Sequence, residues 1–172
     1  MIATNNKNNY QQTIESSIFV KGIGLHTGKD VELNLEPACT DNGIKFIRVD
    51  KSKDNIIEAI WSNVSETVLS TTISNSYGVK ISTIEHLMSA LSGLHIDNLT
   101  VYINSSEVPI MDGSSRPFVD LIEKVGIEVQ NKKRKILNVK KVIEVKNNQS
   151  SAKIIPNNQF SIDFEIDFPS QL

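Results

Sequence analysis

The segment ISTIEHLMSALSGLHID, residues 81–97, places a carboxylate and an imidazole side by side, as Glu85 and His86, where a helix is expected to begin. A metal-activated water needs a nearby carboxylate to take its proton, so an acid beside a ligating histidine suits a hydrolytic metal site. The positive end of the helix dipole would keep the imidazole neutral, as a metal ligand must be. The short zinc motif H-E-x-x-H is not completed, because Ser89 and Ala90 follow. The metal site is therefore a hypothesis on this pair alone.

The same helix start also has a purely structural interpretation. Ser82 and Glu85 fit the S-x-x-E spacing of a capping box, in which each side chain satisfies a backbone N–H of the first turn. On that interpretation His86 is an exposed bystander. At 100° per residue, Glu85 and His86 lie roughly 120° and 140° from the centre of the apolar stripe, so the first turn is expected to face open space. Both interpretations remain open, and a capping role does not exclude a catalytic one.

A second histidine stands in a glycine-rich turn. His26 lies in GIGLHTG, residues 22–28, between Gly24 and Gly28. Such a turn lets the backbone approach a ligand closely, although an ordinary hairpin explains it equally well. The glycine spacing differs from that of a dinucleotide-binding fingerprint. His26 is therefore a candidate substrate-binding residue.

Hydrophobic periodicity predicts the elements that must position these residues. Period-two alternation predicts strands at 29–37, 43–50, 67–74, 78–82 and 98–104, the third and fourth forming a hairpin. Apolar residues at helical spacing predict one helix from Ser82 or Thr83 to about Gly93–Leu94. A second helix is expected after an N-cap at Ser114 or Ser115, with Pro117 in its first turn and Gly126 just past its end.

The polar stretch EVQNKKRK, residues 128–135, is the expected boundary between two parts of the chain. Its basic run lacks interleaved aromatic residues, which favours a solvated linker over a nucleic-acid patch. Strands are predicted beyond it at 136–145 and 160–168, and a lone pair of strands cannot form a stable domain. Residues 1–130 are therefore expected to form an α+β domain that carries the Glu-His motif. Residues 131–172 would be a linker and the opening strands of a truncated second domain.

Bulk composition excludes several classes of protein. The net charge of −2 gives no general attraction to nucleic acid or to an anionic membrane. The single cysteine, Cys39, excludes an internal disulfide framework and suits a reducing compartment. No stretch approaches the roughly 18 apolar residues of a membrane span, and the N-terminus lacks the pattern of a secretory signal. We expect a cytoplasmic protein without a nucleic-acid partner or an integral membrane segment.

Three segments together resemble one family: KGIGLHTGKDVELNLEPA (21–38), STIEHLMSALSGLHIDNL (82–99) and EVPIMDGSSRPFV (107–119). They are similar to the N-terminal part of UDP-3-O-acyl-N-acetylglucosamine deacetylase, and the likeness runs from about residue 11 to residue 169. The resemblance implies two α+β domains of similar topology, packed with their helices inward around an active site. It implies zinc-dependent hydrolytic deacetylation of a UDP-linked acylated glucosamine in lipid A synthesis.

The resemblance also implies roles for individual residues. Glu85 would be the general base for the attacking water, and His86 the first zinc ligand. The segment TVLST, residues 67–71, matches a part of the family that lines the metal site, so Leu69 and Ser70 would lie near the substrate.

The chain departs from the family pattern because several expected residues are missing. The other two zinc ligands, in an H-K-x-x-D motif, and the histidine that acts as general acid lie downstream in the family. A threonine that polarises the carbonyl is also missing, and a basic substrate-binding residue is replaced near Ser150. His26 and Asp112 are the only conceivable further ligands here, so the fragment alone is expected to be inactive. The alternative function is a non-catalytic remnant, an assembly or binding module that retains the fold, in which the Glu-His pair is purely structural.

Overall fold

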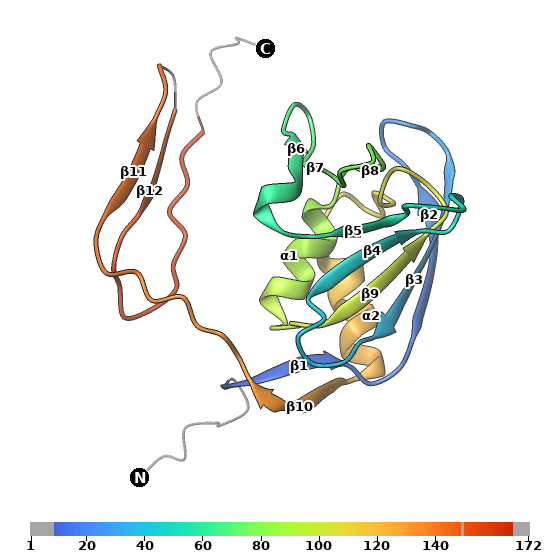
Figure 1. The fold of residues 1–172 in the computed structure, drawn as a ribbon, viewed down its shortest axis with the longest axis horizontal. Helices are drawn as coiled ribbons and strands as arrows, with labels where there is room; N and C mark the ends of the chain where they lie inside the picture. Colours follow the sequence, from blue (N-terminus) through green and yellow to red (C-terminus); the bar gives the residue numbers. More distant parts are fainter. Residues whose placement is uncertain (1–8, 149, 167–172) are drawn as a thin grey trace. The chain divides into compact units, whose positions relative to one another are not determined.

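A computed structural model describes residues 9–148 and 150–166. It confirms the α+β class, because the described residues combine two α-helices with several small sheets (Figure 1). The chain divides into two compact units between Arg134 and Lys135. We call residues up to Arg134 the N-terminal unit and residues from Lys135 the C-terminal unit, and describe each by itself.

A five-stranded sheet forms the centre of the N-terminal unit, in the order β2-β3-β9-β4-β5. Its strands are β2 Ile18–Ile23, β3 Asp30–Pro37, β9 Leu99–Ile103, β4 Ile44–Arg48 and β5 Ile56–Glu58. Neighbouring strands run antiparallel except β4 and β9, which are parallel. The strands expected at 29–37, 43–50 and 98–104 are therefore confirmed. Alternate residues point to the same face, so each of these strands contributes apolar side chains to one layer.

Smaller sheets complete the N-terminal unit. Their strands are β6 Val64–Glu66, β7 Thr72–Ser74 and β8 Lys80–Ile81 in one sheet, and β1 Tyr10–Ile14 with β10 Ile127–Lys133 in another; a short 3₁₀ helix, η2, spans Trp61–Asn63. The hairpin of β7 and β8 is confirmed, and Asn75 shapes its turn by accepting hydrogen bonds from the N–H groups of Tyr77 and Val79, both at 3.1 Å. Strand β7 is shorter than the strand predicted at 67–74, because residues 67–71 form a loop.

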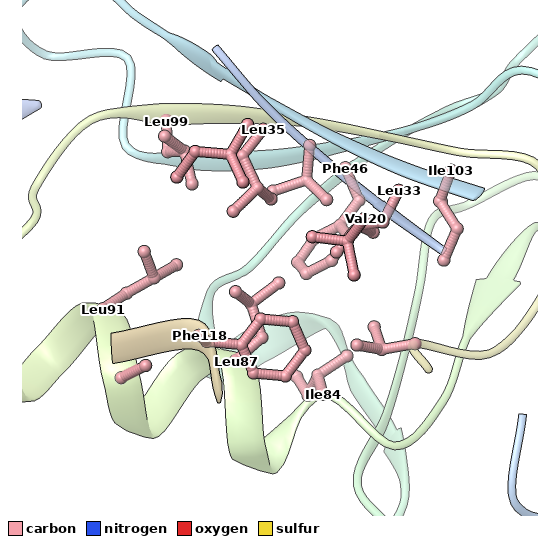
Figure 2. Close-up of a cluster of buried hydrophobic side chains, with 14 of the residues drawn as sticks. Val20, Leu33, Leu35, Phe46, Ile84, Leu87, Leu91, Leu99, Ile103 and Phe118 are labelled. Carbon is pink, nitrogen blue, oxygen red and sulfur yellow. The ribbon is translucent and has the colours of Figure 1, made fainter. Parts of the chain in front are cut away.

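Two helices, α1 Glu85–Gly93 and α2 Arg116–Val125, lie side by side on one face of the five-stranded sheet (Figure 1). Figure 2 shows the hydrophobic core between these layers. The sheet contributes buried side chains such as Leu33 and Phe46, and the helical layer contributes Leu87, Leu91 and Phe118. The apolar stripes predicted for both helices are thus confirmed, and their opposite faces are left for other contacts.

The predicted start of the first helix is wrong, although its end at Gly93 is confirmed. Helix α1 begins at Glu85, and no side chain caps it. Ser82 stays extended because its N–H donates to Ser106 O at 2.9 Å and its carbonyl accepts from Val108 N at 3.1 Å. The Ser82 hydroxyl also donates to Ser106 O, so it cannot serve as a cap. The capping box of Ser82 and Glu85 therefore does not form.

The second helix follows its prediction more closely. Ser115 is the N-cap residue, although its side chain makes no capping hydrogen bond, and Pro117 lies in the first turn. Gly126 ends the helix with φ of 92°, a conformation that favours glycine. The chain then turns directly into β10.

The division between Arg134 and Lys135 falls inside the boundary expected at 128–135, but most of this stretch is strand β10, which pairs antiparallel with β1, and not a solvated linker. Its polar side chains are used to attach this strand pair to the rest of the unit. Gln130 donates to Ala38 O at 2.8 Å, and Arg134 donates to Asp97 at 2.8 Å. The polar residues of this stretch therefore make hydrogen bonds within the N-terminal unit and do not form a solvated spacer.

The C-terminal unit contains the antiparallel pair β11 Ile143–Lys146 and β12 Ser151–Ile154. Of the strand expected at 136–145, only the last three residues, 143–145, belong to β11. The strand expected at 160–168 does not form over residues 160–166, and its last two residues lie outside the described part of the chain. An extended segment needs a neighbour for its backbone hydrogen bonds, and none of the described residues from 135 to 166 is buried. In the part of the chain that the structure describes, no helix has the length and apolar character needed to span a membrane.

Candidate active site

Glu85 stands in the first turn of α1 with its two carboxylate oxygens in different environments. The backbone N–H of Thr71 donates to Oε1. Oε2 is buried and has no hydrogen-bond partner among the described residues. A buried carboxylate oxygen without a partner is unusual, because an unpaired polar atom costs free energy. The arrangement fixes the carboxylate through Oε1 and leaves Oε2 without a hydrogen-bond partner among the described residues.

His86 follows Glu85 in the same turn and is half-buried. The pKa of Asp112 is lowered chiefly by the Ser114 backbone N–H, which donates to Asp112 Oδ1 at 2.9 Å, with a smaller contribution from His86. Asp112, expected only as a conceivable helper, lies in the loop that precedes α2, where its carboxylate is held by Ser114.

The loop of residues 67–71 runs against the first turn of α1, because Thr71 contacts Glu85 directly. Leu69 is 88% exposed and has φ of 64°, which turns the chain at this point. Ser70 is half-buried beside it. Leu69 and Ser70 thus immediately precede Thr71, the residue whose N–H contacts Glu85. The structure also corrects the expectation that the first turn faces open space, since this loop covers Glu85.

His26 lies in an exposed turn closed by two backbone hydrogen bonds, Gly28 N–H to Gly24 O at 2.9 Å and Gly24 N–H to Lys29 O at 3.0 Å. Gly28 has φ of 62°, which accounts for a glycine at that position. The backbone N–H groups of His26 and Thr27 both point to one carboxylate, that of Glu107. The turn is therefore attached to the segment before α2 through Glu107.

Glu107 is a candidate residue that sequence reasoning missed. It is fully buried and accepts hydrogen bonds from His26, Thr27 and the Thr83 hydroxyl. Burial alone would raise the pKa of Glu107, but these hydrogen bonds outweigh burial and hold the pKa below its ordinary value of 4.5. The one available signal was an acid between Ser106 and the apolar pair Val108–Pro109, where a solvated charge is out of place.

The described residues provide part of a metal site and not all of it. They contain no group of three or more His, Cys, Asp or Glu side chains placed to hold one ion. A catalytic zinc takes three protein ligands and leaves one position open. The half-buried imidazole of His86, beside a carboxylate with an unpartnered oxygen, fits one ligand position and one adjacent base.

Known proteins of one family match this chain over nearly its whole length. Residues 11–172 match the model of the family described as LpxC, UDP-3-O-acyl N-acetylglycosamine deacetylase. A UDP-3-O-acyl-N-acetylglucosamine deacetylase from Teredinibacter turnerae is 49% identical, with 92% of this chain and 52% of the relative covered. The enzyme of the same name from Pseudoalteromonas atlantica is 47% identical over the same shares. That of Syntrophus aciditrophicus is 40% identical, over 95% of this chain and 51% of the relative.

The chain spans about half the length of these curated relatives. The family match nevertheless covers well over half of the chain itself, and the identities exceed those at which a shared family is in doubt. The match includes both the Glu-His helix and the loops that meet at its first turn. The chain therefore belongs to the UDP-3-O-acyl N-acetylglycosamine deacetylase family.

Proposed function

We propose that the protein carrying this chain hydrolyses the acetamide of UDP-3-O-acyl-N-acetylglucosamine, releasing acetate and a free amine on the sugar. The observation that carries this proposal is the carboxylate of Glu85, with one oxygen held by Thr71 and the other buried without a partner. An oriented carboxylate with one unpartnered oxygen can act as a general base once a water is brought within hydrogen-bond reach of that oxygen. Family membership adds the substrate and the place in lipid A synthesis.

Zinc is the cofactor we propose, with His86 as one ligand. Because the described residues do not complete a three-ligand site, the other ligands would come from the remainder of a full-length family member. When bound, zinc would supply Lewis acidity toward the attacking water and the amide oxygen.

The residues of this chain would contribute to the reaction as follows. Glu85 Oε2 takes the proton as the water oxygen bonds to the acetamide carbon. The carbon–nitrogen bond then breaks, and the leaving amine takes a proton from an acid outside the described residues. Thr71 keeps the Glu85 carboxylate oriented through Oε1. Leu69 and Ser70, with the His26 turn, would contact the substrate around the reacting amide.

We further propose a cytoplasmic enzyme, because its proposed substrate is a nucleotide-linked sugar. Its partners would be this substrate and the C-terminal half of the same protein, with no nucleic acid. The near-neutral net charge of −2 supports the last point, since nucleic-acid binding depends on a basic surface.

One observation favours a second candidate function for the chain taken alone. Since the described residues lack a complete ligand set, a 172-residue protein would be a non-catalytic module that retains the fold. Its exposed β11–β12 strands would then serve assembly or binding. The reading frame after Leu172 discriminates between the two, because a continuation with an H-K-x-x-D motif would restore the enzyme.

The decisive experiment replaces Glu85 with Gln in a complete deacetylase that carries this chain as its N-terminal half. The expected result is a fall in kcat of roughly 10² to 10⁴, the range for a lost general base, with zinc content unchanged. Acetate release from the UDP-linked substrate measures the rate, and atomic absorption measures the metal. Glu123→Gln is the matched control, because Glu123 is an exposed carboxylate on α2. Full activity, or loss of zinc, in Glu85→Gln would contradict the assigned role.

A further inference from the structure

The buried carboxylate of Glu107 joins two parts of the candidate site that are far apart in the sequence. The N–H of His26 donates to Oε1 at 3.0 Å, and the N–H of Thr27 donates to Oε2 at 2.9 Å. From the other side, the Thr83 hydroxyl donates to Oε1 at 3.0 Å. Both oxygens are thus occupied, and the side chain is completely buried. A buried charge with all its hydrogen bonds made defines one arrangement of its partners.

One of these partners, Thr83, has a backbone conformation that needs support. Its φ is 56°, in the left-handed region that β-branched residues rarely adopt. Thr83 stands two residues before Glu85, so its conformation sets the direction in which the chain enters α1. Such conformations persist only where the surroundings hold them, and they occur most often at functional sites. The hydrogen bond to Glu107 is the side-chain contact that holds Thr83 here.

The backbone around Glu107 contributes to the same arrangement. Ser82 and Glu107 form an isolated parallel β-bridge, so the residue before Thr83 is fixed to the strand-like segment that carries Glu107. On the other side, Gly24 leaves the space in which Glu107 and Thr27 meet. A Cβ atom at position 24 would lie 2.5 Å from Glu107 Oε2, too close for a real contact. Glycine at this position therefore allows the His26 turn to close onto the carboxylate.

We propose that Glu107 is a positioning residue for the deacetylation proposed above: it fixes the Thr83 backbone and the His26 turn, and thereby orients Glu85 and His86 toward the reacting amide. The inference rests on that proposed function. Glu107 does not touch the reacting atoms. It acts indirectly, because the His26 turn and the segment at Thr83 both donate hydrogen bonds to its carboxylate.

A positioning role and a merely structural role predict different measurements. If Glu107 only stabilised the fold, its loss would lower Tm and leave kcat per folded molecule unchanged. If it positions the first turn of α1, its loss shifts Glu85 and His86, so kcat falls and zinc is held less tightly. A misplacement of about 1 Å can lower a rate about 10²-fold.

The test uses Glu107→Gln, Thr83→Val and Thr83→Ser in a complete deacetylase that carries this chain. Glu107→Gln places an amide N–H₂ against backbone donors, so one of their hydrogen bonds must break. Thr83→Val removes only the hydroxyl while keeping the side-chain shape, and Thr83→Ser restores the hydroxyl. The readouts are kcat and KM per folded molecule, Tm, and zinc affinity by chelator competition.

Asp97→Asn is the matched control. Asp97 also accepts hydrogen bonds from distant segments, from Gln12 N–H at 2.9 Å and Arg134 Nε at 2.8 Å. It lies beyond the C-terminal end of α1, whereas Thr83 precedes the N-terminal end. Its loss should lower Tm without changing kcat or zinc affinity.

We expect kcat to fall about 10²-fold in Glu107→Gln and about tenfold in Thr83→Val, with weaker zinc binding, little change in KM, and recovery in Thr83→Ser. If Glu107→Gln does not fold, the two Thr83 variants decide. Thr83→Val behaving like Asp97→Asn, with lower Tm but unchanged kcat and zinc affinity, would overturn the positioning role. Absence of deacetylation by the unsubstituted protein would instead overturn the proposed function. The zinc affinities of the variants would then decide whether Glu107 positions His86.

Discussion

The two units of this chain have the same kind of sequence pattern and opposite outcomes. In β3 of the N-terminal unit, Val31, Leu33 and Leu35 alternate with polar residues, and all three are at most 1% exposed. In β11 of the C-terminal unit, Ile143 and Val145 alternate in the same way, yet they are 50% and 69% exposed. Alternation marks which face of a strand is to be buried. Burial itself requires a second layer, which α1 and α2 supply within the N-terminal unit.

The comparison separates a layered unit with a buried core from a strand pair whose apolar side chains stay exposed among the described residues. A pair of strands with one apolar face is not stable without further strands or a helix. The exposed apolar residues after residue 135 are therefore consistent with a chain that spans about half of its relatives. The candidate active site follows the same division, because Glu85 and His86 lie in the unit that has a core.

The largest expected effect concerns the chain separated from any further sequence. We predict that residues 1–172 alone neither deacetylate the UDP-linked substrate nor bind zinc tightly, because the described residues offer one convincing ligand, His86. The exposed apolar side chains of the C-terminal unit should also drive self-association. Zinc titration calorimetry, an acetate-release assay and sedimentation measure these properties. Stoichiometric tight zinc binding that His86→Ala abolishes, together with turnover, would show a complete site within this chain.

The next largest effect tests the difference in burial directly, with one phenylalanine from each unit. Phe118 is fully buried beneath the sheet, whereas Phe164 is 76% exposed. Phe118→Ala should lower the free energy of unfolding by about 3–5 kcal/mol, the usual cost of removing a buried aromatic ring. Phe164→Ala should change it by less than about 0.5 kcal/mol. Urea denaturation of the 172-residue chain, followed by circular dichroism, measures both.

Equal effects of these two substitutions would contradict the proposed division. A large loss in Phe164→Ala would mean that residues 160–166 have a packing partner in solution. In the complete protein the comparison should change, since a second domain would cover this face. There Phe164→Ala should become destabilising while Phe118→Ala keeps its effect.

The sequence predicted the elements that have both a repeating pattern and a second layer to pack against, whereas the alternation at 160–166 forms no strand. The apolar stripe of α1 and the alternation of β3 depend only on neighbours along the chain and on burial, so periodicity identifies them. The end of α2 at Gly126 was predictable for the same reason, because a glycine with positive φ is a local requirement. Family resemblance then placed Glu85 and His86 in a catalytic hypothesis that periodicity could not supply.

The features that the sequence did not reveal depend on contacts between distant segments. The capping-box spacing of Ser82 and Glu85 was correct as a local pattern, but the β-bridge of Ser82 to Glu107 keeps Ser82 out of the helix. The polar run in β10 was mistaken for a linker because its pairing with β1, more than 100 residues earlier, has no local signal. Glu107 was missed because its partners His26 and Thr83 lie far away in sequence.

The smallest expected effect concerns acid stability and compares one carboxylate from each unit. In the N-terminal unit the pKa of Glu107 is held below its ordinary value of 4.5, because its hydrogen bonds outweigh the effect of burial. A carboxylate with a lowered folded-state pKa stabilises the fold fully above its unfolded-state pKa, and this contribution is lost as the pH falls through the folded-state pKa. The unfolding free energy should therefore decline below about pH 4.5, and Glu107→Gln should make that decline shallower.

Glu144 of the C-terminal unit is the control, because it pairs with Lys146 and Lys153, each at 3.2 Å, on a solvated surface. Glu144→Gln should change the unfolding free energy by no more than about 1 kcal/mol, as exposed ion pairs do. Urea titrations at several pH values measure both variants, and an unchanged acid decline in Glu107→Gln would mean that Glu107 does not contribute to acid stability.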